Sequence, residues 1–132
     1  MNLYIIDANA IRVISYDLLR EKKERITLVA LEEVLHEISG REKVMLFDGV
    51  KLGIASFIKM SEIMQYKYVK VLVDYIENKG AADVSLLAYA LTVNENKLIT
   101  ETPHIVTDDV KLRIACNELS LNWISSNGFK AL

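Results

Sequence analysis

The sequence predicts an α/β fold in which a central, mostly parallel sheet carries helices on both faces. The first observation is a set of short, wholly apolar segments, such as residues 3–6, that lack the polar alternation of a strand with one wet face. The second is that apolar residues between these segments recur at the three- and four-residue spacing of a helix. Strands that alternate with helices are typical of parallel sheets, because each parallel pair needs a long crossover connection.

The elements follow in order along the chain. The predicted strands are short apolar runs: residues 3–6, 26–29, 104–106 and 121–124. The predicted helices run from Asn9 into the charged segment 20–25, over 31–38 before Gly40, over 54–63, over 69–76 before Gly80, from Asp83 to Leu91, and last from Asp108 or Asp109 to Leu119. Residues 97–99 are expected to form a strand or a strand end, and Pro103 is expected to break the chain after them.

Length and composition indicate one globular domain covering residues 1–132. The hydrophobic content of 52% and the mean hydropathy of +0.20 exclude a disordered chain. They also leave enough apolar surface to predict a subunit interface, and we expect a homodimer. The net charge of −2 argues against a simple electrostatic binder of nucleic acid. It argues only weakly against a nuclease, because carboxylates that bind cations distort the charge count.

The sequence favours the cytoplasm as the compartment of this protein. Its lone cysteine, Cys116, cannot form an internal disulfide, which suits a reducing environment. The opening segment MNLYIIDANA does not read as a signal peptide, since an acid interrupts it before a long apolar run develops. No segment approaches the roughly 20 apolar residues of a membrane span, so we expect no membrane contact.

Acidic residues lie where the sites of parallel sheets form, at the carboxyl ends of strands. Asp7 follows residues 3–6, and Asp108 and Asp109 follow the strand at 104–106. Glu37 and Asp83 lie on predicted helices that can face the same edge. Gathered carboxylates raise one another's pKa, and a hard cation such as Mg²⁺ or Mn²⁺ is their natural counterion. Such ions activate water and support displacement at a phosphodiester, so the cluster predicts phosphoryl chemistry.

Each acid also has a purely structural interpretation. Asp83 and Asp108 each precede a helix and can act as helix caps, and Glu37 can simply face water. Asp7 is harder to explain in this way, because a carboxylate at the end of a buried strand is poorly solvated. Other chemistry lacks its motifs: His36 and His104 have no partners at metal-finger spacing, and GxSxG, Walker A and GxGxxG are absent from the sequence.

Four segments together resemble the PIN-domain ribonucleases, a family that includes the toxin halves of many toxin–antitoxin pairs. They span almost the whole chain in the expected order: Tyr4-Ile5-Ile6-Asp7-Ala8-Asn9, Val34-Leu35-His36-Glu37-Ile38, Ala82-Asp83-Val84-Ser85-Leu86-Leu87-Ala88 and Ile105-Val106-Thr107-Asp108-Asp109. No single segment is specific, and the order of all four carries the resemblance.

The resemblance implies a three-layer α/β/α sandwich that cleaves RNA endonucleolytically with Mg²⁺ or Mn²⁺. It assigns catalysis and metal binding to the same acids: Asp7, Glu37, Asp83 and Asp109. It assigns supporting roles to the neighbours Asn9, Thr107 and Asp108, with Asn9 matching the family's serine or threonine near the first acid. It further implies an RNA substrate and an antitoxin protein as a partner.

Two departures from the family pattern keep alternatives open. Lys111 lies where many members have another acid, which points to weaker or single-ion metal binding. Glu33 competes with Glu37 as the second acid, and the Val-Leu-x-Glu-Ile context favours Glu37. The second hypothesis is therefore a PIN-like module that binds RNA or protein with little or no catalysis. A third is an unrelated α/β domain whose acids only cap helices, in which case Asp7 and Asp83 would lie far apart.

Overall fold

The computed structural model describes residues 1–73, 81–96 and 98–132. All four strands of its sheet are parallel: β1 (Asn2–Ile6), β2 (Thr27–Val29), β3 (Thr102–Val106) and β4 (Asn122–Ile124), in the order β2-β1-β3-β4. The helices are α1 (Ala8–Val13), α2 (Tyr16–Arg25), α3 (Glu32–His36), α4 (Arg41–Val44), α5 (Ile54–Ile63), α6 (Lys67–Lys70), α7 (Ala81–Glu95), α8 (Val110–Glu118) and α9 (Ser126–Lys130).

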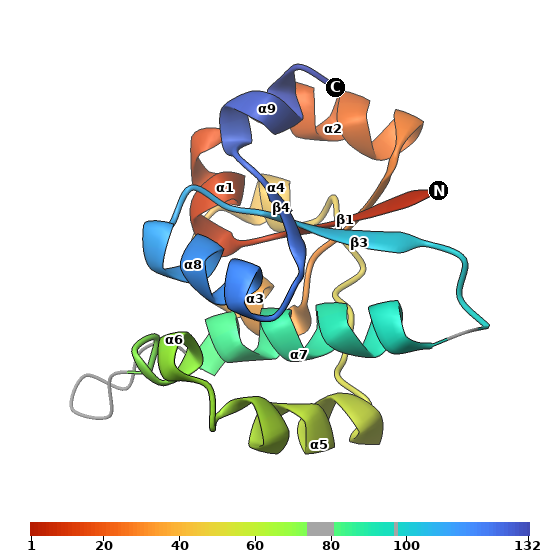
Figure 1. Cartoon of the computed structure of the whole chain (residues 1–132). Coiled ribbons are helices and arrows are strands. Elements are labelled where there is room, and N and C mark those ends of the chain that lie inside the picture. Colours follow the sequence, from red (N-terminus) through yellow and green to blue (C-terminus); the bar gives the residue numbers. More distant parts are fainter. Residues whose placement is uncertain (74–80, 97) are drawn as a thin grey trace.

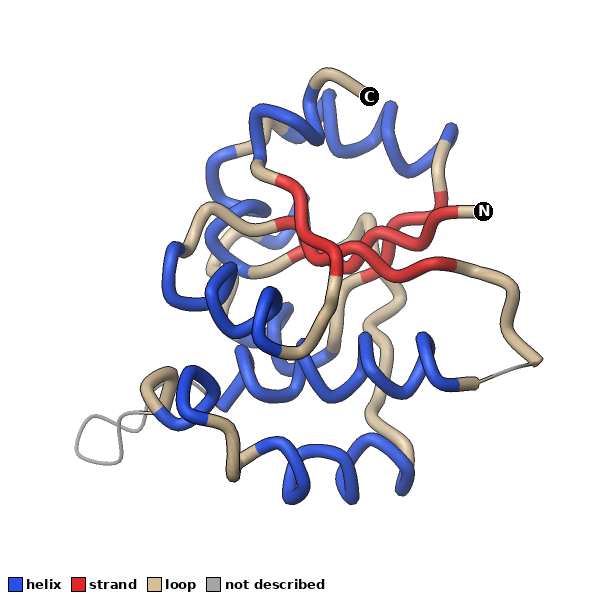
Figure 2. Tube along the Cα trace, viewed as in Figure 1, coloured by secondary structure: helices blue, strands red, loops and turns tan. Residues whose placement is uncertain are grey.

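The helices cover both faces of the sheet, which confirms the predicted three-layer α/β/α sandwich (Figures 1 and 2). In Figure 1, α2 and α9 lie above the sheet and α7 lies below it, with α5 packed on the outer side of α7. Strand order explains this division. The chain steps from β1 to β2 in one direction and from β3 to β4 in the other, so right-handed crossovers fall on opposite faces.

The two central strands form the middle of the core. Ile5 and Ile6 of β1 and Ile105 and Val106 of β3 are fully buried, as expected for strands with helices on both sides. Each such side chain contributes roughly 1.5–3 kcal/mol through burial of its apolar surface. This core fixes the ends of β1 and β3 beside each other, and the acids that follow both strands are fixed with them.

The prediction of one helix from Asn9 into the segment 20–25 is wrong in one respect, because the structure has two helices there, α1 and α2. The chain leaves helical geometry at Ile14, and the Ser15 side chain accepts a hydrogen bond from the backbone N–H of Leu18 to cap α2. Ile14 itself is fully buried, so its place in the apolar pattern comes from its burial in the core and does not indicate one continuous helix. The next predicted helix is shorter than expected, because α3 ends at His36 with Glu37 as its C-cap, before Gly40.

The least regular part of the chain is the middle, where several predictions fail. Among the described residues of the helix predicted over 69–76, α6 ends at Lys70, and residues 74–80, which include Ile76 and Gly80, lie outside the described residues. The helix expected to open at Asp83 begins two residues earlier, at Ala81. Lys97 also lies outside the described residues, and Leu98 is not in a strand: it is 93% exposed, without the neighbours that bury a strand.

Pro103 does not interrupt the chain as predicted, because it lies inside β3, opposite Leu3. The backbone N–H of Thr102 donates to Met1 on the β1 side, so the nitrogen of Pro103 faces the other side of β3. There β4 pairs only from His104 onward, so the missing N–H of proline removes no ladder bond.

The helix predicted to be the last one, now α8, is followed by α9. Ser125 caps α9 by accepting from the N–H of Gly128, and Phe129 anchors it in the core. Five residues are too few to show a helical period in the sequence. In the part of the chain that the structure describes, no helix combines the length and apolarity needed to cross a bilayer.

Candidate active site

The strand order places the acids at a switch point of the sheet. From β1 the chain turns outward to β2, and it later returns to β3 on the other side of β1, so a crevice opens above the carboxyl ends of β1 and β3. Asp7 follows β1 directly, and its backbone N–H donates to the carbonyl of Val106 at 3.1 Å. Thr107 to Asp109 follow β3 at the same edge.

Asp7 is held as a buried carboxylate at the start of α1. Its side chain is the N-cap of that helix, where Oδ1 accepts from the backbone N–H of Ala10 at 2.8 Å, and the residue is only 4% exposed. Burial raises the pKa of Asp7, Asp109 and Asp108 raise it further, and hydrogen bonds from Thr107 and Ala10 partly offset this by stabilising the charged form. The residue serves as a cap, as its structural interpretation allows, and still carries an unfavourable buried charge.

Asp109 reaches the same site from the start of α8. Its Oδ1 accepts from the backbone N–H groups of Lys111 and Leu112 at 2.9 and 3.3 Å, so it is the N-cap of that helix. The fully buried Thr107 hydroxyl accepts from the backbone N–H of Asp109 at 3.1 Å and hydrogen-bonds Asp7. Thr107 therefore connects two of the acids through hydrogen bonds.

Asp83 enters the site from the first turn of α7. Its pKa is raised to about 7, mainly by burial and then by the nearby Asp109, Asp7 and Glu37, in that order. The negative charges of these three acids favour the protonated form of Asp83, so its ionisation is electrostatically coupled to theirs. The position of Asp83 in the first turn matches its structural interpretation as a favourable acid near a helix N-terminus, but its raised pKa does not.

Glu37 and Glu33, the two candidates for the second acid, have different surroundings. Glu37 is exposed at the end of α3 and lines the pocket that also contains Asp7 and Asp83. Glu33 is one turn earlier, and its Oε2 accepts from the hydroxyl of Ser85 at 2.9 Å. It lines a different, more apolar groove with His36 and Phe57. The geometry thus brings Glu37, and not Glu33, to the other acids.

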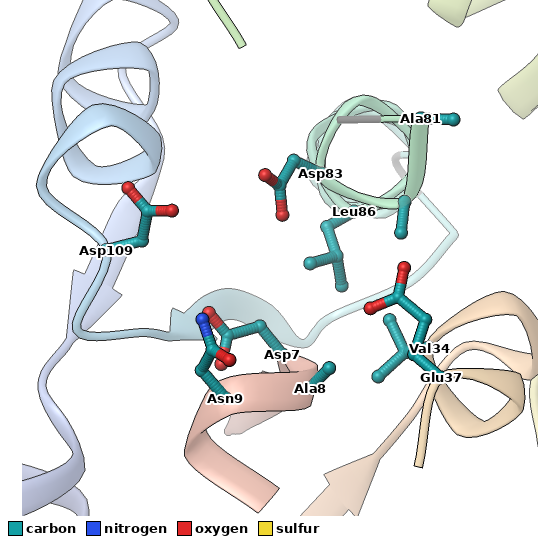
Figure 3. Close-up of a pocket in the computed structure, with 10 residues that line it drawn as sticks. Asp7, Ala8, Asn9, Val34, Glu37, Ala81, Asp83, Leu86 and Asp109 are labelled. Atoms are coloured by element: carbon teal, nitrogen blue, oxygen red, sulfur yellow. The ribbon is translucent and has the colours of Figure 1, made fainter. Parts of the chain in front are cut away.

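The four predicted acids line one pocket of about 250 Å³, together with Asn9. Figure 3 shows Asp83 and Asp109 with their carboxylates turned toward each other, Asp7 below them, and Glu37 reaching in from the opposite side. Apolar side chains, including Val34 and Leu86, form the rest of the wall. Asp7 and Asp83 are therefore close, contrary to what an α/β domain with unrelated helix caps would show.

Asp108 does not line this pocket. Its carboxylate accepts from the backbone N–H and the hydroxyl of Ser126 and pairs with Arg113 at 3.3 Å. The hydrogen bonds from Ser126 lower the pKa of Asp108, with Arg113 and Lys130 acting in the same direction. Asp108 thus binds the first residue of α9, whose N-cap is Ser125, whereas its structural interpretation expected it to cap the helix that follows it.

We therefore expect substitution by asparagine to have different effects at Asp109 and at Asp108, on manganese affinity and on stability respectively. In Asp109→Asn the amide oxygen keeps the cap of α8, so we expect the fold to persist while manganese affinity falls at least tenfold, or about 1.4 kcal/mol. In Asp108→Asn we expect a loss of about 1 kcal/mol of unfolding free energy and little change in manganese affinity. Calorimetric titration with Mn²⁺ and urea unfolding of both variants measure this; equal loss of affinity would contradict it.

Asn9 lines the pocket and is joined to a residue that sequence reasoning missed. The Arg12 guanidinium donates to Oδ1 of Asn9 and to the backbone carbonyl of Glu37, both at 2.8 Å. The three-residue spacing of Asn9 and Arg12 on one helix is the only sequence signal for this contact. The contact to Glu37 joins residues 25 apart, and nothing local in the sequence indicates it.

The donor set fits a hard divalent cation, because carboxylate and amide oxygens are the ligands that Mg²⁺ and Mn²⁺ prefer. The crowded, high-pKa carboxyl of Asp83 supports the same fit, since a cation relieves the repulsion that raises its pKa. Within residues 1–73, 81–96 and 98–132, no three acidic, histidine or cysteine side chains are already arranged to hold an ion. Ligation by three of them therefore requires some of these side chains to move.

Compared by sequence, the chain matches no family model and no curated protein.

Proposed function

We propose that this protein is a metal-dependent endoribonuclease that hydrolyses RNA phosphodiester bonds. The observation that carries the proposal is the convergence of Asp7, Glu37, Asp83 and Asp109 on one pocket at the switch point of a parallel sheet. These acids come from four separate segments, so helix capping alone does not explain their meeting. A functional site is the usual place for carboxylates held against their mutual repulsion.

The residues of the pocket have distinct chemical capacities. A bound Mg²⁺ or Mn²⁺ would supply an activated water and charge stabilisation at the scissile phosphate. Asp7 and Asp109, fixed as helix caps, offer carboxylate oxygens in rigid positions. Asp83, with a pKa of about 7 in the metal-free protein, would exchange its proton for the cation near neutral pH, so that metal binding there depends on pH. The pocket contains no serine, cysteine or lysine nucleophile among its described lining residues.

The choice of RNA as the substrate comes from the resemblance of four segments to PIN-domain ribonucleases. On the same basis we propose a toxin of a toxin–antitoxin pair. The lone cysteine and the high apolar content further lead us to propose a cytoplasmic homodimer. The apolar side chains Ile54, Phe57 and Ile58, each more than half exposed on α5, support an interface of some kind.

A second candidate is a PIN-like module that binds RNA or protein without cleaving RNA. Lys111 favours it, because this cation lies in the first turn of α8, beside Asp109, where the family pattern has another acid. A site without that further acid has one carboxylate fewer with which to bind a metal ion.

The test is incubation of the purified chain with end-labelled single-stranded RNA in Mg²⁺, in Mn²⁺ and in a chelator. We expect internal cleavage that needs the metal and is absent from Asp109→Asn purified in parallel, which controls for contaminating nuclease. Cleavage in the chelator, or equal cleavage by Asp109→Asn, would refute the proposal. Manganese binding and RNA binding without any cleavage would favour the second candidate.

A further inference from the structure

Arg12 connects the two sides of the acidic pocket. It lies on α1, five residues after Asp7, and its two terminal nitrogens donate to Oδ1 of Asn9 and to the backbone carbonyl of Glu37. Asn9 and Glu37 both line the pocket, Asn9 from α1 and Glu37 from the end of α3. The planar guanidinium holds both acceptors in one fixed geometry.

The acceptor at Glu37 is a carbonyl at a helix end. Glu37 is the C-cap of α3, and carbonyls there have no partner within their own helix. A cation is stabilising at the C-terminal end of a helix, because the helix dipole is negative there. Arg12 thus supplies a charge-assisted bond to the backbone of Glu37, and the chain at this point is tied to α1.

A second cation connects the same two regions, but here the donor lies outside α1 and the acceptors lie on α1. Lys43 of α4 donates to the carbonyls of Ile11 and Arg12, at 2.9 and 3.0 Å, at the end of α1. The segment from Glu37 to Lys43 is therefore attached to α1 at both of its ends. Arg12 binds the backbone of Glu37 at one end, and Lys43 binds the backbone of α1 from the other. Because α1 begins directly after Asp7, these bonds set the place of Glu37 relative to Asp7.

We propose that Arg12 is a positioning residue that holds Glu37 where it completes the metal site, an inference that rests on the metal site proposed above. Positioning and charge have opposite effects here, which makes the role measurable. If Arg12 acted only through its charge, its removal would strengthen binding of a divalent cation, because like charges repel. If Arg12 positions Glu37, its removal weakens binding, because one ligand loses its fixed location.

The experiment is calorimetric titration of Mn²⁺ alone into the wild type, Arg12→Met and Arg12→Lys. We expect Arg12→Met to weaken manganese binding about tenfold, the low end for residues that orient metal ligands. Arg12→Lys keeps the charge but not the two-pronged geometry, so it should bind with intermediate affinity, about threefold weaker than the wild type. The spectrum of bound Mn²⁺ in electron paramagnetic resonance should change in both variants.

Arg20→Met is the matched control. Arg20 lies on α2, where it is exposed and pairs only loosely with Glu24, at 3.8 Å, so its loss changes the net charge equally without touching the pocket. We expect its manganese affinity to equal that of the wild type. Unchanged or tighter binding by Arg12→Met, with thermal unfolding like that of the control, would overturn the inference. Absence of manganese binding in the wild type would overturn the metal site itself, and this inference with it.

Discussion

Asp7→Asn is expected to abolish manganese binding and RNA cleavage while leaving the fold intact. Asparagine has nearly the same shape, and its amide oxygen can accept the hydrogen bond from Ala10 that caps α1. What it lacks is the negative charge and the second carboxylate oxygen. Loss of a residue that merely orients a ligand already lowers affinity about 10- to 100-fold, so loss of a ligand should exceed about 100-fold.

The same substitution should not destabilise the metal-free protein. Burial raises the pKa of Asp7, which means that its charge is unfavourable in the folded state. A neutral amide removes that penalty, and we expect Asp7→Asn to unfold at equal or higher urea concentration than the wild type at neutral pH. Titration with Mn²⁺, RNA cleavage and urea unfolding of the two proteins provide the measurement. Cleavage at the wild-type rate would show that the site is elsewhere.

The largest effect of pH is expected from Asp83. Its pKa is raised from 3.8 to about 7 in the folded chain, so the folded protein keeps a proton in this interval that the unfolded chain has released. The resulting stabilisation is fully present below pH 3.8 and is lost as the pH rises to about 7. At about 1.4 kcal/mol for each pH unit, the loss in the metal-free protein has an upper limit of about 4 kcal/mol.

Asp83→Asn isolates this effect. The variant cannot lose a proton from this side chain, so we expect it to be more stable than the metal-free wild type by at least about 1 kcal/mol near pH 8, and by less near pH 5. Urea unfolding in a chelator at both pH values measures the difference. Manganese affinity of the wild type should change in the opposite sense and increase up to about pH 7, since the ion competes with the proton. Parallel stability curves for both proteins would contradict the coupling of Asp83 to the other acids.

The architecture and the positions of the acids could be predicted because both depend on short-range patterns. The apolar run that ends at Asp7 and the one that ends at Thr107 indicate buried strands, and parallel pairing then brings their carboxyl ends to one edge. Periodicity likewise predicts Asp83 on a helix, and it predicts a helix through Glu37, which instead is the C-cap at the end of α3. Their order along the chain predicts that they meet Asp7, and all of these acids line one pocket.

The features that could not be predicted depend on contacts between distant segments. Nothing near Asp108 in the sequence indicates that Ser126 will bind it, so its position alone predicts that it caps the adjacent helix, α8. The link from Arg12 to Glu37 is equally non-local. The expectation for Pro103 is wrong because a proline is excluded from a strand only where its nitrogen faces a partner strand, and that depends on the length of β4.

The dispersal of the acids along the chain has a consequence for synthesis. The first acid is at position 7 and the last at position 109, and they meet only when β3 has taken its place beside β1. A nascent polypeptide still attached to the ribosome therefore lacks the complete cluster until most of its length has emerged. If the proposed nuclease activity depends on all four acids, a nascent chain is inert toward its own messenger, and a fragment that ends before Asp109 does not cleave RNA.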